Sequence, residues 1–213
     1  MRLRDATFGD LTDRADQNTC YLEPRGPIDW GLLFGNERPV EVEVGCGKGL
    51  FLSNAASQRL AHNFFAIEIS RKYALFAADR VFRRGLSNAR VARADASQVL
   101  RDWLPAASVS ALHVYFPDPW WKRRHKKRRV FTAEFVQQAS RLLIPGGELQ
   151  LATDVEEYFG LMKRLVAAHA SFAPIAAPAM HEPEHDLDYL TNFERKARMA
   201  GKSVFRAVYH RVP

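Results

Sequence analysis

Short apolar runs rich in β-branched and aromatic residues alternate along the chain with segments of helical periodicity. Five of these runs predict strands, at Val40–Val44, Asn63–Ile69, Asn88–Ala94, Ala111–Phe116 and Glu148–Thr153. The second run is almost continuously apolar, which is typical of a strand buried on both faces of a parallel sheet. A last strand is expected at Val204–Val212, close to the end of the chain.

Helices are expected between the strands. Four helices are predicted. One begins at Leu50 after a glycine-rich turn, one spans Arg71–Arg84 after the cap Ser70, one ends at Leu143 after the cap Thr132, and one spans Val155–Ala170. Two of them show apolar stripes toward the core, formed by Tyr73, Phe76, Ala77 and Val81 and by Phe159, Met162 and Val166. Strands and helices in this alternation predict an α/β fold, with a parallel sheet covered on both faces.

The chain is expected to form one domain behind an N-terminal arm. Residues 1–27 are polar and irregular, with loose order expected in the first 20, and residues 28–213 suffice for one α/β core. No apolar run approaches the roughly 20 residues of a membrane helix, and the first residues lack the apolar core of a signal peptide. Cys20 and Cys46 have no metal-type spacing, so a reduced, cytoplasmic protein is expected.

The positive charge is concentrated in one segment. The formal net charge is +7, and positions 122–129 hold seven Lys or Arg and no acid, so the remainder of the chain sums to zero. Such a block makes a local field that attracts phosphate backbones, whereas a solubility surface, which is the alternative, usually mixes both signs. The segment therefore favours a nucleic-acid partner. It directly follows Asp118, which lies between two prolines.

Acidic residues recur at the carboxyl ends of the predicted strands. Glu68, Asp95, Asp118 and Asp154 lie at or just past four of these ends, and Glu43 lies two residues before the glycine turn. A single such acid is commonly a helix cap, and Asp154 could cap the helix that follows it. Ligands of parallel α/β sheets bind at this edge, so the recurrence of acids predicts a ligand site there.

The spacing of the glycine turn indicates the kind of ligand. Gly45–Gly49 reads Gly-x-Gly-x-Gly, whereas the dinucleotide fingerprint needs two residues between its second and third glycines. The P-loop order of phosphate-binding residues is also missing. The turn therefore suits a nucleoside with an amino-acid tail, such as S-adenosylmethionine. Glu68 could accept from its ribose hydroxyls, Asp95 from the adenine amino group, and Glu43 could face the cationic methionine end.

With these motifs the chain resembles the bacterial tRNA (guanine-N7)-methyltransferases, a family of class I S-adenosylmethionine-dependent methyltransferases. The matching segments follow the family's order, at 41–49, 66–69, 94–96, 116–129, 153–154 and 191–194. The glycine turn alone indicates only a class I methyltransferase. The Pro-Asp-Pro-Trp stretch with its basic segment and the Thr-x-Phe-Glu near the end are more specific. Trp121 and Cys46 depart from the family pattern.

The resemblance implies a Rossmann-like, mostly parallel sheet with a C-terminal antiparallel strand. It implies methyl transfer from S-adenosylmethionine to guanine N7 in the tRNA variable loop (tRNA position 46). The implied cofactor contacts are Glu43, Gly45, Gly47, Glu68, Asp95 and Asp118, of which Asp118 is also the implied catalytic residue. The implied guanine or tRNA contacts are Lys122, Asp154, Thr191, Asn192, Phe193 and Glu194. RNA contacts are implied at Arg124, His125, Lys126, Lys127, Arg128 and Arg129. No metal or membrane is implied, and both a monomer and a homodimer stay open.

The chemistry of guanine N7 fits this set. N7 has an in-plane lone pair and no proton, so its attack on a methyl group needs alignment and no general base. Asp118, held by its flanking prolines, suits stabilisation of the positive charge that develops on the base. Asp154 and Glu194 could accept from guanine N1–H and the exocyclic amine, and Thr191 could add a further hydrogen bond.

Several interpretations remain open at this stage. Trp120 and Trp121 could stack on a displaced base or pack in the core, and Phe193 is expected to pack and position its neighbours. His113 is expected to be buried and hydrogen-bonded. Two other functions are a class I methyltransferase acting on another RNA, a protein or a small molecule, and a non-catalytic RNA-binding protein of the same fold.

Overall fold

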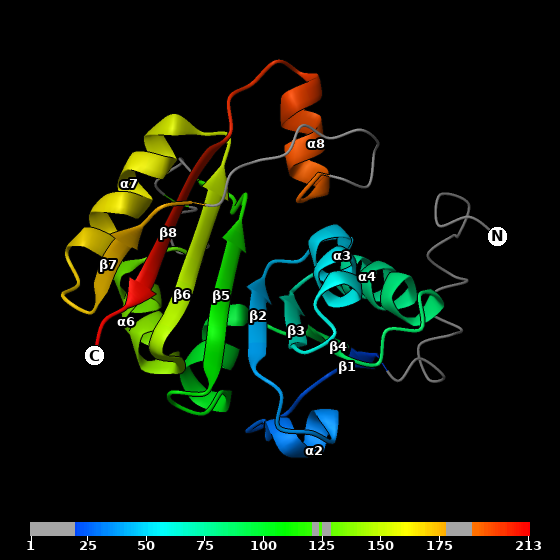
Figure 1. Cartoon of the computed structure of the whole chain (residues 1–213). Helices are drawn as coiled ribbons and strands as arrows, with labels where there is room; N and C mark the ends of the chain where they lie inside the picture. Colours follow the sequence, from blue (N-terminus) through cyan, green and yellow to red (C-terminus); the bar gives the residue numbers. More distant parts are fainter. Residues whose placement is uncertain (1–19, 121–123, 125–128, 178–188) are drawn as a thin grey trace.

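A central sheet carries helices on both faces (Figure 1). The computed structural model describes residues 20–120, 124, 129–177 and 189–213, and eight strands in this part of the chain form one sheet. The strand order is β1-β4-β3-β2-β5-β6-β8-β7. The bounds are β1 Tyr21–Leu22, β2 Val40–Val44, β3 Asn63–Glu68, β4 Ala89–Arg93, β5 Val109–Tyr115, β6 Leu143–Thr153, β7 Phe172–Ile175 and β8 Phe205–Arg211.

The pairing is parallel over most of the sheet. β2 runs parallel to both β3 and β5, and β1–β4, β3–β4 and β5–β6 are parallel pairs as well. β8 is antiparallel to β6 and to β7. The predicted fold class, mostly parallel with a C-terminal antiparallel strand, is therefore confirmed. The carboxyl ends of β2, β3, β4 and β5 meet at one edge, where ligands of such sheets bind.

The helices divide between the two faces of the sheet. Their bounds are α2 Trp30–Phe34, α3 Leu50–Gln58, α4 Arg71–Arg83, α5 Ala96–Gln98 with the π-helical turn η2 Val99–Trp103, α6 Ala133–Leu142, α7 Glu156–Ala167 and α8 Asn192–Met199. One hydrophobic cluster joins η2, α6 and α7 to the sheet, and a second joins α3 and α4 to the other face. α8 lies above the carboxyl edge of the strands (Figure 1).

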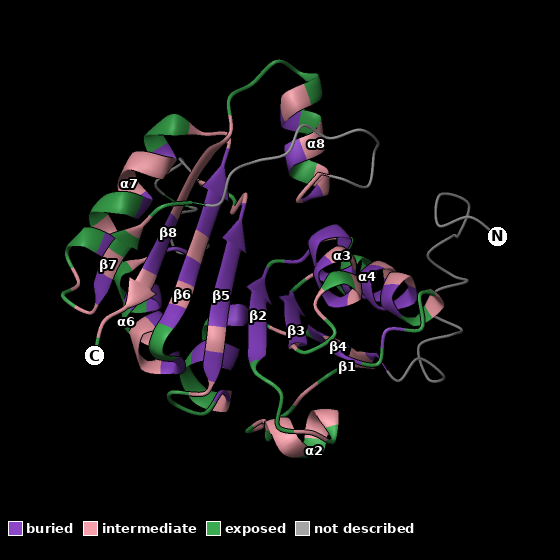
Figure 2. Ribbon diagram, viewed as in Figure 1, coloured by how far each residue is buried: buried purple, intermediate pink, exposed green. Residues whose placement is uncertain are grey.

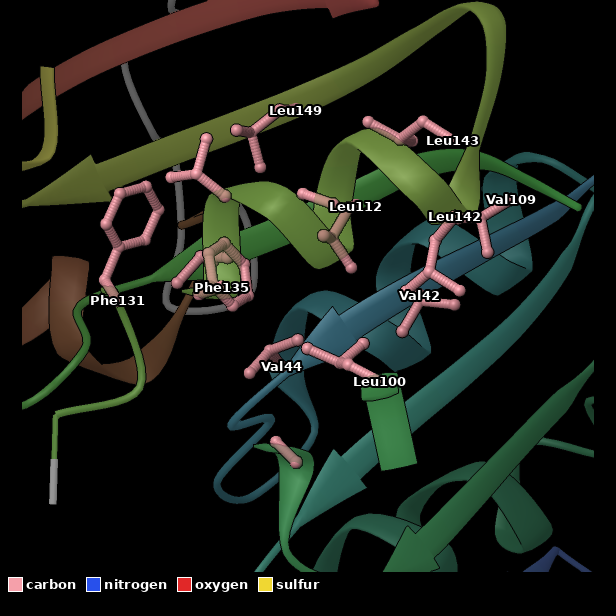
Figure 3. Packing of buried hydrophobic residues seen from close by; sticks show 14 of the residues in the cluster. Val42, Val44, Leu100, Val109, Leu112, Phe131, Phe135, Leu142, Leu143 and Leu149 are labelled. Atoms are coloured by element: carbon pink, nitrogen blue, oxygen red, sulfur yellow. The ribbon is translucent and has the colours of Figure 1, made fainter. Parts of the chain in front are cut away.

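Alternation along the strands explains the two clusters. In β3, Phe65 and Ile67 pack into the first cluster, whereas Phe64 and Ala66 pack into the second, since successive side chains point to opposite faces. Every residue of β2 and β3 is buried (Figure 2). Figure 3 shows the first cluster, in which Val42 and Val44 lie near Leu100 of η2.

Two predicted core stripes were partly wrong. In α4 the buried face is formed by Ala74, Leu75, Ala77, Ala78, Asp79 and Val81, and Tyr73 is instead 42% exposed because it borders a cavity. In α7 the fully buried aromatic is Tyr158, whereas Phe159 stacks on Phe205 of β8 at a centroid distance of 5.6 Å.

The fifth predicted strand begins earlier than expected. β6 starts at Leu143, and a register irregularity in its pairing with β5 takes up Ile144–Gly147. A side chain at Gly147 would meet the carbonyl oxygen of Ile144 at 2.9 Å, which explains a glycine at this point.

The N-terminal region contributes more structure than the sequence indicated. β1 pairs with β4, and Asp29 caps α2 by accepting from the Leu32 N–H at 2.9 Å. Trp30 of α2 then packs edge-on against Phe65. The expectation of loose order concerns residues that lie outside the described part, apart from Cys20. In the described ranges, no helix has the length and apolar character needed to cross a membrane.

Candidate active site

A cavity of about 620 Å³ opens at the carboxyl edge of the central strands. Strand order determines how it is lined. Glu68 ends β3 and Asp95 follows β4 on one side of the glycine turn, and Asp118 follows β5 on the other side. The predicted site residues that line the cavity are Gly45, Gly47, Glu68, Asp95, Asp118, Arg129, Asn192 and Phe193. The structure therefore brings together most of the acids that the sequence placed at strand ends.

The glycine turn brings backbone to the wall of the cavity. Gly45, Gly47 and Gly49 all have positive φ angles, of 78°, 53° and 68°, which glycine adopts at little cost. A side chain at Gly49 would lie 2.8 Å from the Cβ of Ala77, so this glycine also permits close packing of the turn on α4.

Glu68 is held by two backbone donors. Its Oε2 accepts from the N–H of Gly47 and its Oε1 from the N–H of Ser70, each at 2.9 Å. Each oxygen retains a lone pair, so the carboxylate can still accept from two vicinal hydroxyls. Asp95 accepts from the Ser97 N–H at 2.8 Å and caps α5. These two carboxylates therefore fit the ribose and adenine of a nucleoside donor.

Glu43 lies beneath the turn rather than on the cavity wall. Its side chain is 4% exposed, and its Oε2 has no hydrogen-bond partner in the described structure. Burial and the nearby charge of Glu68 raise the pKa of Glu43 to about 8, although the backbone of Leu52 donates to its carboxylate. Glu43 is not among the residues that line the cavity, so its predicted contact with the donor stays a prediction.

The segment that carries Asp118 has a strained backbone. Phe116 and Trp120 have φ angles of 51° and 40°, which residues other than glycine rarely adopt. Arg129 donates from Nε to the carbonyl oxygen of Pro119 at 2.6 Å, and its guanidinium lies 5.8 Å from the ring centroid of Tyr158. Arg129 therefore lies in the wall of the cavity and fixes the Asp118 segment at Pro119. Trp120 also lines the cavity.

α8 roofs the cavity, and the sequence did not predict it as a helix. Thr191 caps it by accepting from the Glu194 N–H at 3.0 Å. Phe193 is 52% exposed and stacks on Phe116 with an interplanar angle of 20°. The Thr-x-x-Glu spacing is that of a capping box and could have revealed the helix. The cavity lining also includes three cationic residues that the sequence analysis missed, Lys48, Arg195 and Lys196.

Other predicted acceptor residues point their polar atoms elsewhere. Glu194 is 1% exposed, accepts from the Leu190 N–H, and pairs with Arg198 at 2.9 Å and Arg206 at 2.8 Å. Asp154 does not cap the helix after it, because its carboxylate pairs with Lys202 at 3.0 Å. Asp154, Thr191 and Glu194 are absent from the cavity lining formed by the described residues.

His113 is buried and hydrogen-bonded, as predicted. Its Nε2 lies 2.7 Å from Glu41 and its Nδ1 lies 2.9 Å from the Tyr115 hydroxyl. Burial lowers the pKa of His113. Burial works to raise the pKa of Glu41, but His113, Arg59 and His62 outweigh it and hold that pKa below its usual value. This network is therefore part of the structural core beside the cavity.

Part of the predicted RNA-contact segment lies outside the described residues. This applies to Trp121, Lys122, His125, Lys126, Lys127 and Arg128. Arg124 is described and exposed. In the described ranges, no group of three or more His, Cys, Asp or Glu side chains could hold a metal ion.

Comparisons with known proteins show the family of the chain. A family model described as "Putative methyltransferase" matches residues 37–207. The tRNA (guanine-N(7)-)-methyltransferase of Rhodopirellula baltica is 43% identical over 190 residues, which cover 86% of this chain and 70% of the relative. The enzyme of that name from Hydrogenovibrio crunogenus is 36% identical over 185 residues, which cover 87% and 77%.

Solved structures show the same fold. The 16S rRNA methyltransferase KamB superposes with a TM-score of 0.65 at 19% identity, covering 89% of this chain and 96% of that chain. Together with the glycine turn and the strand-end carboxylates, this fold defines a class I methyltransferase. The chain belongs to the family of the tRNA (guanine-N7)-methyltransferases, as the family model and the 43% identical relative show. The predicted fold class and family are thus confirmed.

Proposed function

We propose that this protein transfers a methyl group from S-adenosylmethionine to N7 of a guanine in tRNA, in the variable loop. The observation that carries the proposal is the arrangement of carboxylates around the glycine turn. Glu68 and Asp95 line one side of the cavity, and Asp118 lines the other with Asn192 and Phe193 of α8. One cavity thus offers a nucleoside site beside a second site that has its own carboxylate.

The donor side uses fixed backbone and two carboxylates. Glu68, held by Gly47 and Ser70, accepts from the ribose hydroxyls, and Asp95 accepts from the adenine amino group. The bound donor supplies an electrophilic methyl group on a sulfonium. The backbone of the glycine turn lies against the amino-acid tail, and Glu43 supports the turn from beneath.

The acceptor side needs positioning rather than proton transfer. Because guanine N7 carries no proton, the chain has only to align N7 with the methyl group. The base becomes cationic as the bond forms, so the Asp118 carboxylate stabilises the developing charge. The strained backbone at Phe116 and Trp120 and the clasp from Arg129 keep Asp118 in place.

α8 supplies the contacts to the base. Asn192 carries both an acceptor and donors, as recognition of a guanine edge requires, and exposed Phe193 offers a surface for stacking. Thr191 and Glu194 act on the base indirectly, since they cap α8 and tie it to Arg206 of β8. Asp154 can contact guanine only after release from Lys202.

The RNA backbone is bound by the basic segment, with Lys122 bordering the base and residues 124–129 contacting phosphates. Arg129 has a second role in this proposal, because it also holds Pro119. A cytoplasmic location follows from a tRNA acceptor. A monomer and a homodimer are both compatible with this site, and no metal takes part in the proposed transfer.

Methyl transfer to an unmodified tRNA transcript tests the proposal. The protein is incubated with donor labelled in the methyl group, and the digested nucleosides are separated. The expected product is labelled N7-methylguanosine from the variable loop. Label on another nucleoside, on ribosomal RNA alone or on protein alone would contradict the proposed acceptor.

A further inference from the structure

Three cationic side chains gather at the glycine turn and on the outer side of α4. Lys48 lies between two glycines of the turn, and its ammonium group is 5.3 Å from the ring centroid of Phe76. Arg80 donates from Nε to the carbonyl oxygen of Lys48 at 3.1 Å. Arg84, one helical turn further along, donates to Oδ1 of Asn54 at 2.9 Å. Lys48, Arg80 and Arg84 form the α4 cationic cluster.

The described residues provide no carboxylate partner for this cluster. All its hydrogen bonds go to a carbonyl or an amide oxygen. The neighbouring Arg83, by contrast, pairs with Asp79 at 2.9 Å. Burial, together with the charge of Arg84, lowers the pKa of Arg80. Arg80 lies in the last turn of α4 and Arg84 directly follows the helix, and no carboxylate of the described residues pairs with either, so both charges can pair with an external anion.

The cluster adjoins the cavity through Lys48, on the other side of the glycine turn from Asp118 and Arg129. Lys48 itself lines the cavity. α4 follows β3 and lies beside α3 (Figure 1), whereas the segment with Asp118 and Arg129 follows β5, and β2 with its glycine turn separates the two. A long polyanion that reaches the cavity along the basic segment can therefore continue past the glycine turn onto α4.

We propose that the α4 cationic cluster binds backbone phosphates of the tRNA, as a second contact that is distinct from the segment 122–129. This inference rests on the proposed function. The cluster combines two guanidinium groups and one ammonium group with no carboxylate partner among the described residues, and guanidinium and ammonium groups are the usual donors to backbone phosphates. The cluster thus holds a part of the tRNA outside the target loop.

The test measures the salt dependence of tRNA binding. Arg84→Gln and the double variant Arg80→Gln/Arg84→Gln are compared with the wild type, using an unmodified tRNA transcript over a salt series. Each lost phosphate contact should reduce the slope of log affinity against log salt by about 0.7–0.9. Arg38→Gln is the matched control, because Arg38 also donates to a carbonyl, that of Leu60 at 3.0 Å, but precedes β2 at the opposite edge. Its slope should stay unchanged.

Crosslinking provides an independent measurement. Both native cysteines are buried, so an Arg84→Cys variant can be labelled selectively with a photoreactive group. Label at position 84 should crosslink to tRNA, and label at Arg38→Cys should not.

Three results would overturn the inference or its basis. Unchanged salt slopes in both glutamine variants, with no crosslink at position 84, contradict phosphate binding by the cluster. A loss of S-adenosylhomocysteine affinity with an unchanged salt slope shows that the cluster serves the donor instead. A wild-type protein without measurable tRNA affinity overturns the proposed function, and this inference with it.

Discussion

Nε of Arg129 lies 2.6 Å from the carbonyl oxygen of Pro119, to which it donates a hydrogen bond. This bond joins the last residue of the basic segment to Pro119, the residue directly after Asp118. The last residue of the proposed RNA-contact segment thus belongs to the wall of the cavity. In the proposed function, RNA binding at Arg129 and the placement of Asp118 are therefore physically connected.

Replacement of Arg129 should reduce the methyl-transfer rate more than RNA affinity. Arg129→Gln removes the clasp on Pro119, and a displacement of about 1 Å near the reacting atoms can lower the rate about 10²-fold. Single-turnover kinetics at saturating tRNA would measure this effect. Arg124→Gln, which changes an exposed arginine of the same segment, should raise KM and leave kcat close to wild type. The reverse pattern would make Arg129 a phosphate contact only.

Asp118→Asn should remove most of the activity and preserve the fold. The substitution keeps the size of the side chain but removes the charge that stabilises a cationic base, and losses of about 10²–10³-fold in kcat are typical of such groups. The measurement is kcat at saturating donor and tRNA, with the dissociation constant of S-adenosylhomocysteine as the companion. A fall in donor affinity large enough to account for the whole loss would contradict the assigned role.

Glu43 should make the protein less stable as the pH rises. Its folded-state pKa of about 8 lies above the ordinary glutamate pKa of 4.5, so between these two pH values the unfolded chain is ionised at this residue while the folded protein keeps the proton. The free energy of unfolding therefore falls across this window. Urea unfolding at pH 5.5 and 8.5 should show a smaller pH effect in Glu43→Gln. In contrast, Glu134→Gln, which changes an exposed carboxylate, should retain the wild-type pH dependence.

Glu194→Gln should destabilise α8 and its link to β8. The variant leaves Arg206 and Arg198 without the buried carboxylate that they share, and removal of one partner from a buried pair typically costs about 3–5 kcal/mol. Thr191→Ala, which removes only the cap, should cost about 1 kcal/mol. Denaturant unfolding with hydrogen exchange in α8 measures both. Equal, small effects would show that Glu194 does not anchor the helix.

The strand-end acids could be predicted from the sequence because their position depends on local pattern. The continuous apolar run of β3 ends at Glu68, and the parallel order then brings Glu68, Asp95 and Asp118 to one edge. The fold class follows from the same alternation. Ser70 and Thr132 were predicted as caps for the same reason, and both caps are present.

What the sequence could not show depends on contacts between distant residues. Glu194 of α8 is buried and paired because Arg206, which belongs to strand β8, lies beside it. Asp154 likewise forms an ion pair with the distant Lys202, although the local sequence pattern predicts Asp154 as a helix cap. Tyr73 has the spacing of a core residue but borders a cavity that exists only in the folded chain. The charge balance also concealed the α4 cationic cluster, since acids elsewhere in the sequence offset its charge.

Replacement of the target guanine by 7-deazaguanine tests whether N7 is the atom that accepts the methyl group. The analogue keeps the Watson–Crick edge and the ring surface of guanine, but a carbon replaces N7, so the lone pair that attacks the methyl group is missing. Two otherwise identical tRNA transcripts, one with guanine and one with the analogue at the acceptor position, are incubated with protein and labelled donor. The guanine transcript should be methylated, and the 7-deazaguanine transcript should bind without being methylated. Equal methylation of both transcripts would contradict methyl transfer to N7.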